Sequence, residues 1–176
     1  MSNFEIRIND KIIGNNHSPF IICELSGNHN GSIDRCINLL KMAKKTGCDA
    51  IKLQTYTPDT LTINCERKDF QIDSGLWKGN SLYQLYKEAH TPYEWHAKLF
   101  EVAKNLKITI FSTPFDKSAV DLLEELETPA YKIASFEITD LPLIRYVASK
   151  RKPMILSTGL ANFEEIKAAV DTAKNN

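Results

Sequence analysis

The sequence predicts an α/β fold in which a parallel sheet is covered by helices, and two features of the chain point to it. After Pro19, short apolar runs recur, and longer segments with apolar residues at helical spacing lie between them. Crossovers of this length join parallel strands, whereas short turns join antiparallel ones. The pattern leaves two architectures open, a closed barrel and an open doubly wound sheet.

An N-terminal hairpin is expected before the repeating units. Phe4, Ile6 and Ile8 alternate with polar residues, Asn9-Asp10 is a turn signal, and an extended pattern resumes at 11–13. Five strands are expected after the hairpin, at FIIC (20–23), AIKLQ (50–54), ITIF (108–111), AYKIA (130–134) and PMIL (153–156).

The segments between these strands carry the signals of crossover helices. Apolar residues lie at helical spacing in 33–43 and again in 120–126. Ser32 is expected to cap the first helix, and Thr91 a later one that has proline at its first position. Asn162 offers a similar cap for the last helix.

The stretch from Thr55 to Asn80 departs from this rhythm. It separates the second expected strand from its helix and contains Pro58, Gly75 and Trp77. Loops of this length in a compact domain are usually functional or mobile. We therefore expect a long functional or mobile loop.

Composition limits the classes of function. The chain has 176 residues, 43% of them hydrophobic, and its 22 Lys+Arg balance 22 Asp+Glu. We expect one soluble domain that binds neither nucleic acid nor membrane, because no basic field and no apolar span is present. The N-terminal residues do not resemble an export signal, which favours the cytoplasm. Free and mostly packed thiols are expected at Cys23, Cys36, Cys48 and Cys65, whose spacing fits neither zinc nor disulfide patterns.

Polar side chains end each of the five expected strands. Parallel α/β folds place their sites at the carboxyl ends of the strands, so these side chains are expected to share one rim. Successive side chains of a strand alternate between faces, so Lys52 and Gln54 project from the same face. The members of the rim are Glu24, Lys52, Gln54, Thr113, Lys132, Ser135 and Ser157.

Two lysines within buried strands point to an anion ligand. Desolvating an ammonium without a partner costs on the order of several kcal/mol, and this chain does it at Lys52 and Lys132. Together with the hydroxyls they suit a small dianion or trianion that bears phosphate or carboxylate groups. Glu24 supplies a carboxylate for proton transfer.

Structural alternatives stay open for each of these residues. Hydroxyls after strands often cap the next helix, a strand lysine can extend its ammonium to solvent, and Glu24 can simply pair with Lys52. His29, in the loop SGNHNGS, either contacts substrate polar groups or stabilises the loop. His90 and His96 are six residues apart, which is not the spacing of a helical metal pair. Trp77 and Tyr83 are more often loop packing than ligand contacts.

Five ordered segments resemble the signature segments of the sialic acid synthase superfamily. They are ICELSGNHNGS, DAIKLQTY, FSTPFD, PAYKIASFEITDLPLI and KPMILSTG, and the resemblance runs along the whole chain. Within the superfamily, DSGLWKGNSLYQLYKEAHTPYEWH resembles the pseudaminic acid synthases rather than the N-acetylneuraminate or legionaminate synthases.

The resemblance implies a (β/α)₈ TIM barrel that condenses phosphoenolpyruvate with an open-chain N-acylated amino sugar and releases phosphate by C–O cleavage. The implied sugar is 2,4-diacetamido-2,4,6-trideoxy-β-L-altropyranose. By matching position, Glu24 is implied as the catalytic residue for proton transfer. The implied phosphoenolpyruvate ligands are Lys52, Thr113, Lys132, Ser135 and Ser157, and the implied sugar ligands are Gln54, Asn28 and His29.

The resemblance also implies parts beyond this sequence. Residues 1–176 match about five of the eight βα units, so a further barrel portion and an antifreeze-like domain are expected in the complete protein. A divalent metal, Mn²⁺ or Mg²⁺, is implied with its ligands in that portion, as is a homodimer. Residues 1–176 alone are expected to be inactive. The non-enzymatic alternative is a half-barrel binding or interaction module, since an incomplete barrel exposes strand edges.

Overall fold

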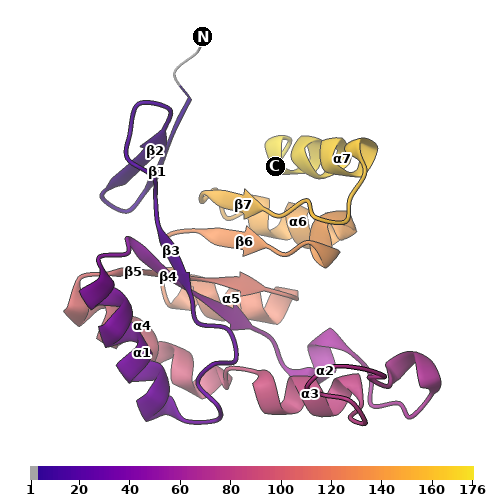
Figure 1. Ribbon diagram of the computed structural model, residues 1–176. Coiled ribbons are helices and arrows are strands. Elements are labelled where there is room, and N and C mark those ends of the chain that lie inside the picture. The colour runs from indigo at the N-terminus through magenta and orange to yellow at the C-terminus, as the bar shows by residue number, and fades with distance from the viewer. Residues whose placement is uncertain (1–3) are drawn as a thin grey trace.

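The computed structural model describes residues 4–176 and contains two sheets (Figure 1). The first is the expected antiparallel hairpin, formed by β1 (Glu5–Ile8) and β2 (Lys11–Gly14). The second is a parallel sheet of five strands at the five expected positions. Its strands are β3 (Ile22–Glu24), β4 (Ala50–Thr55), β5 (Thr109–Pro114), β6 (Tyr131–Ile133) and β7 (Met154–Leu156).

The order of the strands distinguishes the two architectures that the sequence leaves open. Each strand pairs with the one before it in the chain, in the order β3-β4-β5-β6-β7. An open doubly wound sheet reverses its order at a switch point, whereas a barrel adds every strand to the same edge. Right-handed crossovers then put the helices on one face. The sheet is therefore a curled half barrel, and the predicted fold class is confirmed.

Two groups of helices cover the outer face. Residues of α1 (Ile33–Thr46) and α4 (Tyr93–Leu106) share one apolar core with β4. A second core joins β6 and β7 to three more helices. These are α5 (Lys117–Glu125), α6 (Leu141–Ala148) and α7 (Phe163–Lys174), and the 3₁₀ helix η2 (Phe136–Thr139) precedes α6.

The connection after β4 contains more structure than expected. It holds α2 (Pro58–Leu61), the 3₁₀ helix η1 (Lys68–Phe70) and then α3 (Leu82–Ala89). In Figure 1, α2 and α3 lie together, away from α1 and α4. The expected long loop is thus divided into short ordered segments.

Two of the three expected helix caps are confirmed. The Ser32 hydroxyl accepts from the Arg35 amide, and Asn162 forms a capping box with Glu165. The prediction for Thr91 is wrong, because α4 begins at Tyr93 with Pro92 as its N-cap residue and no side-chain cap. The Thr91 hydroxyl is buried and bonds instead to His29.

Alternation along the strands separates a helix-facing side from the interior of the half barrel. On β4, Ile51 and Leu53 belong to the core shared with the helices, so Ala50, Lys52 and Gln54 face the interior. At the amino-terminal end of the strands the hairpin closes this interior, where Ile8 packs with Ala50 and Phe111. The polar rim therefore stands above an apolar floor.

The hairpin is also attached to the sheet by a polar contact. Asn9, with φ at 52°, lies in the hairpin turn, and its amide donates to the Thr109 hydroxyl over 3.1 Å at the start of β5. Within residues 4–176, no helix combines the length and apolar character that a bilayer crossing requires.

Candidate active site

A buried ammonium lies at the centre of the rim. Lys52 sits beside Glu24 in the register of β3 and β4, and its Nζ is 3.0 Å from Glu24 Oε2. The side chain of Lys52 is only 4% exposed, whereas that of Glu24 is 56% exposed. Nζ also donates to the buried Thr113 hydroxyl over 3.4 Å. Lys52 thus does not extend to solvent, and its carboxylate partner can rehydrate if a ligand replaces it.

Lys132 adds a second positive charge to the same interior. It is half-buried on β6, and burial lowers the pKa of its ammonium, with the neighbouring Lys52 charge lowering it further. Glu24 and Glu137 oppose this shift. An anion placed beside Lys132 would oppose this shift and stabilise its charged form.

Glu137 is a site residue that the predictions missed. It lies on η2, two residues after Ser135, and its Oε2 is buried without a hydrogen-bond partner. Burial raises the pKa of its carboxyl group, and Lys132 is the nearby cation that lowers it. Glu137 also raises the pKa of Tyr86 on α3, although burial of Tyr86 is the larger cause. The sequence offered a signal for Glu137, because it is an acidic residue shortly after the fourth strand, and Glu24 was selected for its place at the end of the first.

None of the three predicted hydroxyls caps a helix with its side chain. Asp116 caps α5, so the Thr113 hydroxyl remains available to Lys52. Asn162 caps α7, so the Ser157 hydroxyl plays no part in capping that helix. Ser135 makes no side-chain cap bond at the start of η2. Its hydroxyl oxygen lies close to Gly159, where an added Cβ would come within 3.3 Å of it. A side chain at 159 would therefore crowd Ser135.

Gln54 and Thr55 point to opposite faces of β4. Gln54 lies opposite Thr113 in the parallel register, on the interior face with Lys52. On the helix side, Thr55 bonds to His96 Nε2 at 2.8 Å and to the Ser112 hydroxyl at 2.6 Å, all three side chains being buried. Burial lowers the pKa of His96. This network fixes β4 and β5 to α4 behind the rim.

The placement of His29 opposes its predicted contact with the sugar. The ring is fully buried, Nδ1 accepts from the Gly31 amide over 3.1 Å, and Nε2 contacts the Thr91 hydroxyl at 3.3 Å. Burial lowers the pKa of His29, and His90 adds to this effect. Neither nitrogen is free for substrate, so His29 stabilises the loop, which is the alternative reading of its motif.

Asn28 is tied to its own loop as well. Its side-chain amide donates to the Leu25 carbonyl over 3.0 Å, and its backbone carbonyl accepts from Arg35 Nε over 2.8 Å. The amide oxygen remains for a ligand, and sugar binding by Asn28 stays a prediction.

The thiols are free as expected, but Cys23 on the edge strand β3 is exposed rather than packed.

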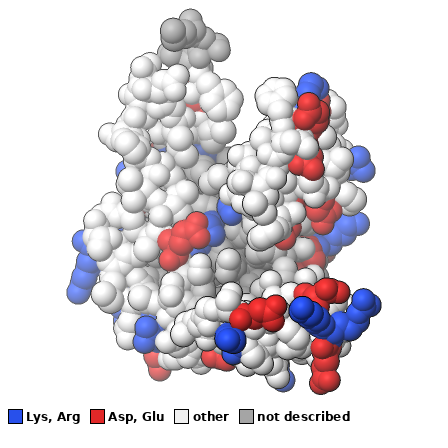
Figure 2. Space-filling view, turned by 45° about the vertical axis from the view of Figure 1, so that its right-hand side comes forward, with Lys and Arg blue, Asp and Glu red and all other residues white. Residues whose placement is uncertain are grey.

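The charges on the protein surface are mixed. Acidic and basic side chains are interspersed on the face shown in Figure 2, without a wide area of one sign. Among residues 4–176, no group of three or more His, Cys, Asp or Glu is placed to hold a metal ion. Any group that attracts an anion on this face is therefore local, and Lys52 with Lys132 is the candidate that the fold brings together.

The chain is similar in sequence to curated pseudaminic acid synthases. The chain is 52% identical over 147 residues to a pseudaminic acid synthase of Campylobacter jejuni, with 84% of this chain and 43% of that protein covered. It is 47% identical to the pseudaminic acid synthase of Helicobacter pylori, covering 89% of this chain and 46% of that protein. The chain thus spans about half the length of these curated relatives.

A solved structure shares the fold. The N-acetylneuraminic acid synthetase of Leptospira borgpetersenii superposes with a TM-score of 0.85 at 29% identity, over 98% of this chain and 56% of that one. The sequence model of the NeuB family matches residues 39–176. This match covers well over half of the chain and confirms the resemblance that its motifs indicate. The chain belongs to the NeuB family.

Proposed function

We propose that this chain forms the phosphoenolpyruvate-binding part of a synthase that makes pseudaminic acid. The observation that carries the proposal is the buried Lys52 ammonium, held by Glu24 and Thr113 with Lys132 close by in the same interior. Two desolvated cations at the carboxyl ends of parallel strands are costly for a fold and useful for an anionic substrate. The identity of 47–52% to pseudaminic acid synthases supports this choice of product.

Phosphoenolpyruvate matches the chemistry of the rim. Its carboxylate would pair with Lys52, and its phosphate with Lys132 and the hydroxyls of Ser135 and Ser157. The carboxylate would then replace Glu24 as the partner of the buried ammonium. Glu24 would be released toward solvent and the second substrate, in agreement with its 56% exposed side chain.

The proposed reaction forms one C–C bond and breaks one C–O bond. Carbon 3 of phosphoenolpyruvate attacks the sugar aldehyde, whose oxygen gains a proton, and carbon 2 becomes cationic. Water adds at carbon 2 and loses a proton, which leaves a hydroxyl there. This hydroxyl then loses its own proton, its oxygen forms the keto carbonyl, and the bond between carbon 2 and the bridging oxygen breaks, so that phosphate leaves with the electron pair of that bond. Glu24 is the proposed proton-transfer group, and Gln54 the proposed contact to the sugar.

The divalent metal expected for the family would supply Lewis-acid polarisation of the aldehyde. The described residues offer no set of ligands for it. We therefore assign no metal ligand in this chain and no step of the reaction to a metal. A cytoplasmic homodimer stays the expectation for the complete protein.

The choice of sugar is tested by comparing substrates on the protein as its gene encodes it. We expect turnover with 2,4-diacetamido-2,4,6-trideoxy-altrose to exceed that with N-acetylmannosamine by about tenfold or more in kcat/KM, equivalent to about 1.4 kcal/mol. A preference for N-acetylmannosamine would instead identify an N-acetylneuraminate synthase, and a preference for the 2,4-diacetamido-mannose isomer a legionaminate synthase.

Lys132→Ala tests the phosphate contact. Loss of a charged contact to the phosphate is expected to weaken phosphoenolpyruvate binding by about 2 kcal/mol or more. Because the pKa of Lys132 is lowered, affinity in the parent should decline as pH rises and the ammonium deprotonates, at lower pH than for an ordinary lysine. Calorimetric titrations across the alkaline range measure both effects. Equal affinities in parent and variant would remove Lys132 from the site.

Residues 1–176 by themselves are expected to lack synthase activity. In the described sheet β3 and β7 each have one unpaired edge, and such edges favour self-association. Supplying this polypeptide with phosphoenolpyruvate, the diacetamido sugar and Mn²⁺ while recording phosphate release and light scattering tests the expectation. Sustained turnover by a monomer would show that the half barrel is sufficient. Stable monomers that bind no anion would favour the non-enzymatic interaction module.

A further inference from the structure

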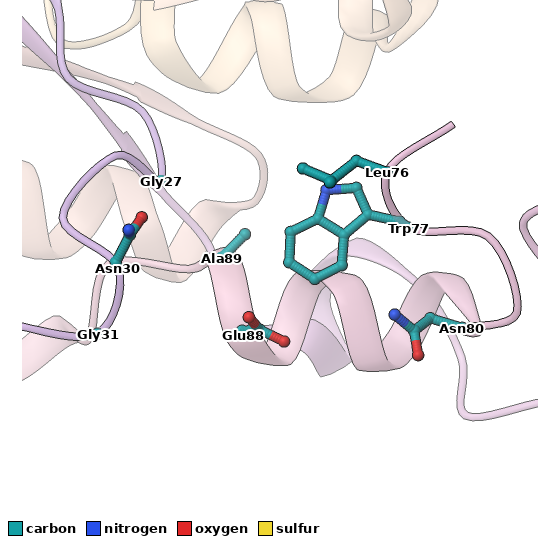
Figure 3. A pocket seen from close by; sticks show the side chains of 8 residues that line it. All are labelled: Gly27, Asn30, Gly31, Leu76, Trp77, Asn80, Glu88 and Ala89. Carbon is teal, nitrogen blue, oxygen red and sulfur yellow. The ribbon is translucent and has the colours of Figure 1, made fainter. Parts of the chain in front are cut away.

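A cavity that none of the rim residues lines plays no part in the proposed anion site. Its volume is about 530 Å³, and it lies between the loop after β3 and the segments around α3 (Figure 3). Its lining consists of Gly27, Asn30, Gly31, Leu76, Trp77, Asn80, Glu88 and Ala89. Figure 3 shows the Trp77 indole directed from its loop toward Ala89, with the loop of Asn30 beyond.

The turn that carries Trp77 is held by backbone hydrogen bonds. Ile72 donates to the Asn80 carbonyl and Gly79 donates to the Ile72 carbonyl, each over 3.0 Å. Gly75 and Gly79 have φ of 78° and 90°, a conformation that glycine adopts without strain. Leu76 and Trp77 lie between these two glycines, so the turn presents both side chains on a defined backbone.

The opposite wall is also fixed in place. Gly27 packs so closely on α3 that an added Cβ would lie 3.0 Å from the Ala89 carbonyl oxygen. His29 bonds to the Thr91 hydroxyl, and its ring meets Trp95 edge-on at 5.4 Å between centroids. The buried His29 therefore attaches the loop after β3 to the junction of α3 and α4, and this keeps the cavity open.

The polar groups of the lining are free to bind a ligand. Within residues 4–176, the side chains of Asn30, Asn80 and Glu88 and the indole N–H of Trp77 form no hydrogen bond or ion pair. Amides both donate and accept, a carboxylate accepts from hydroxyl or amide N–H groups, and the indole face packs on C–H groups. The cavity has no cationic lining residue, and the charge of Glu88 disfavours a phosphate.

We infer that this cavity, which we call the Trp77 pocket, binds an acylamino arm of the sugar substrate and that Trp77 determines specificity for that arm. An acetamido group has a methyl for the indole and Leu76, and an amide for Asn30 and Asn80. The walls follow β3 and β4 in the chain, and the same two strands carry Glu24 and Gln54, so we place the aldehyde of the sugar at the rim and its far end in this pocket. The inference rests on the proposed function.

Trp77→Ala is the main test, made in the protein as its gene encodes it. We expect the KM for the diacetamido sugar to rise about tenfold, the effect of about 1.4 kcal/mol of lost contact, while kcat and the KM for phosphoenolpyruvate change little. Trp77→Phe, which keeps an aromatic face, should restore most of the loss. The preference for the diacetamido sugar over the analogue without the second acetamido group should narrow by a similar factor in Trp77→Ala.

The matched control is Ile63→Ala, an exposed apolar residue of the same connection that does not line the pocket. It should leave kcat, the KM for the sugar, the KM for phosphoenolpyruvate and the preference for the diacetamido sugar unchanged. An active Trp77→Ala enzyme with normal sugar KM and normal discrimination would overturn the inference and leave the proposed function intact.

Calorimetric titration with the diacetamido sugar separates the two proposals if the parent releases no phosphate. Weaker binding to Trp77→Ala than to the parent and Trp77→Phe supports the pocket even without turnover. Equal binding to all three, or no binding to the parent, contradicts it. Circular dichroism melting of each variant shows that a loss of binding does not come from unfolding.

Discussion

Replacing Lys52 by methionine is expected to weaken phosphoenolpyruvate binding strongly while leaving the fold at least as stable as that of the parent. The ammonium is nearly fully buried, and its partner Glu24 is more than half exposed, so the pair recovers little of the cost of desolvating Lys52. Methionine fills a similar volume without that cost, and Glu24 can be hydrated. Phosphoenolpyruvate loses its buried counter-charge, which should weaken binding by about 100-fold or more.

Two measurements test the expected effects on stability and on phosphoenolpyruvate binding. Thermal melting compares the stability of the parent with that of Lys52→Met, and calorimetry compares their affinity for phosphoenolpyruvate. Lys41→Met, at an exposed position of α1, controls for the loss of one positive charge. A strongly destabilised Lys52→Met with normal affinity would make Lys52 a structural residue, and the anion site would have to lie elsewhere.

Glu24→Gln is expected to lower kcat by about 10²-fold or more, because it keeps the shape of the side chain and removes the group that transfers a proton. Phosphoenolpyruvate affinity should not fall, because in the free protein the Glu24 carboxylate occupies Lys52 and so competes with the ligand. Single-turnover and steady-state measurements of phosphate release give kcat, and calorimetry gives the affinity.

The same variant has a second signature in its stability. Without Glu24 the buried Lys52 ammonium loses its ionic partner, so the ligand-free protein should be destabilised by about 1–3 kcal/mol. Phosphoenolpyruvate should recover this loss and raise the Tm of Glu24→Gln more than that of the parent. A variant with near-normal turnover and an ordinary ligand response would show that the ion pair serves only the fold.

The sequence predicts the secondary structure of the sheet well, because apolar runs and turn signals are local. All five strands and the hairpin lie where the runs predict them. The choice between a barrel and a doubly wound sheet depends on strand order, which is set by packing between distant segments. Thr91 failed as a cap for a similar reason, since its hydroxyl bonds to His29, 62 residues away.

The site was predictable to the extent that it follows from strand geometry. Lys52 and Thr113 meet because adjacent parallel strands bring their carboxyl ends together. The burial of His29 could not be predicted, because a histidine in a polar loop gives no sign of being buried. Glu137 was missed because its burial near Lys132 depends on packing around η2. The cavity at Trp77 depends on the packing of two separate loops.

The most direct test of the central claim, that this rim binds phosphoenolpyruvate for C–O cleavage, uses substrate labelled with ¹⁸O at the bridging position. The protein as its gene encodes it is incubated with the labelled substrate and the diacetamido sugar, and the products are analysed by mass spectrometry. We expect the label to appear in inorganic phosphate, and Lys52→Met to form much less of it at the same substrate concentration. Label retained in the sugar product, or equal phosphate release by Lys52→Met, would contradict it.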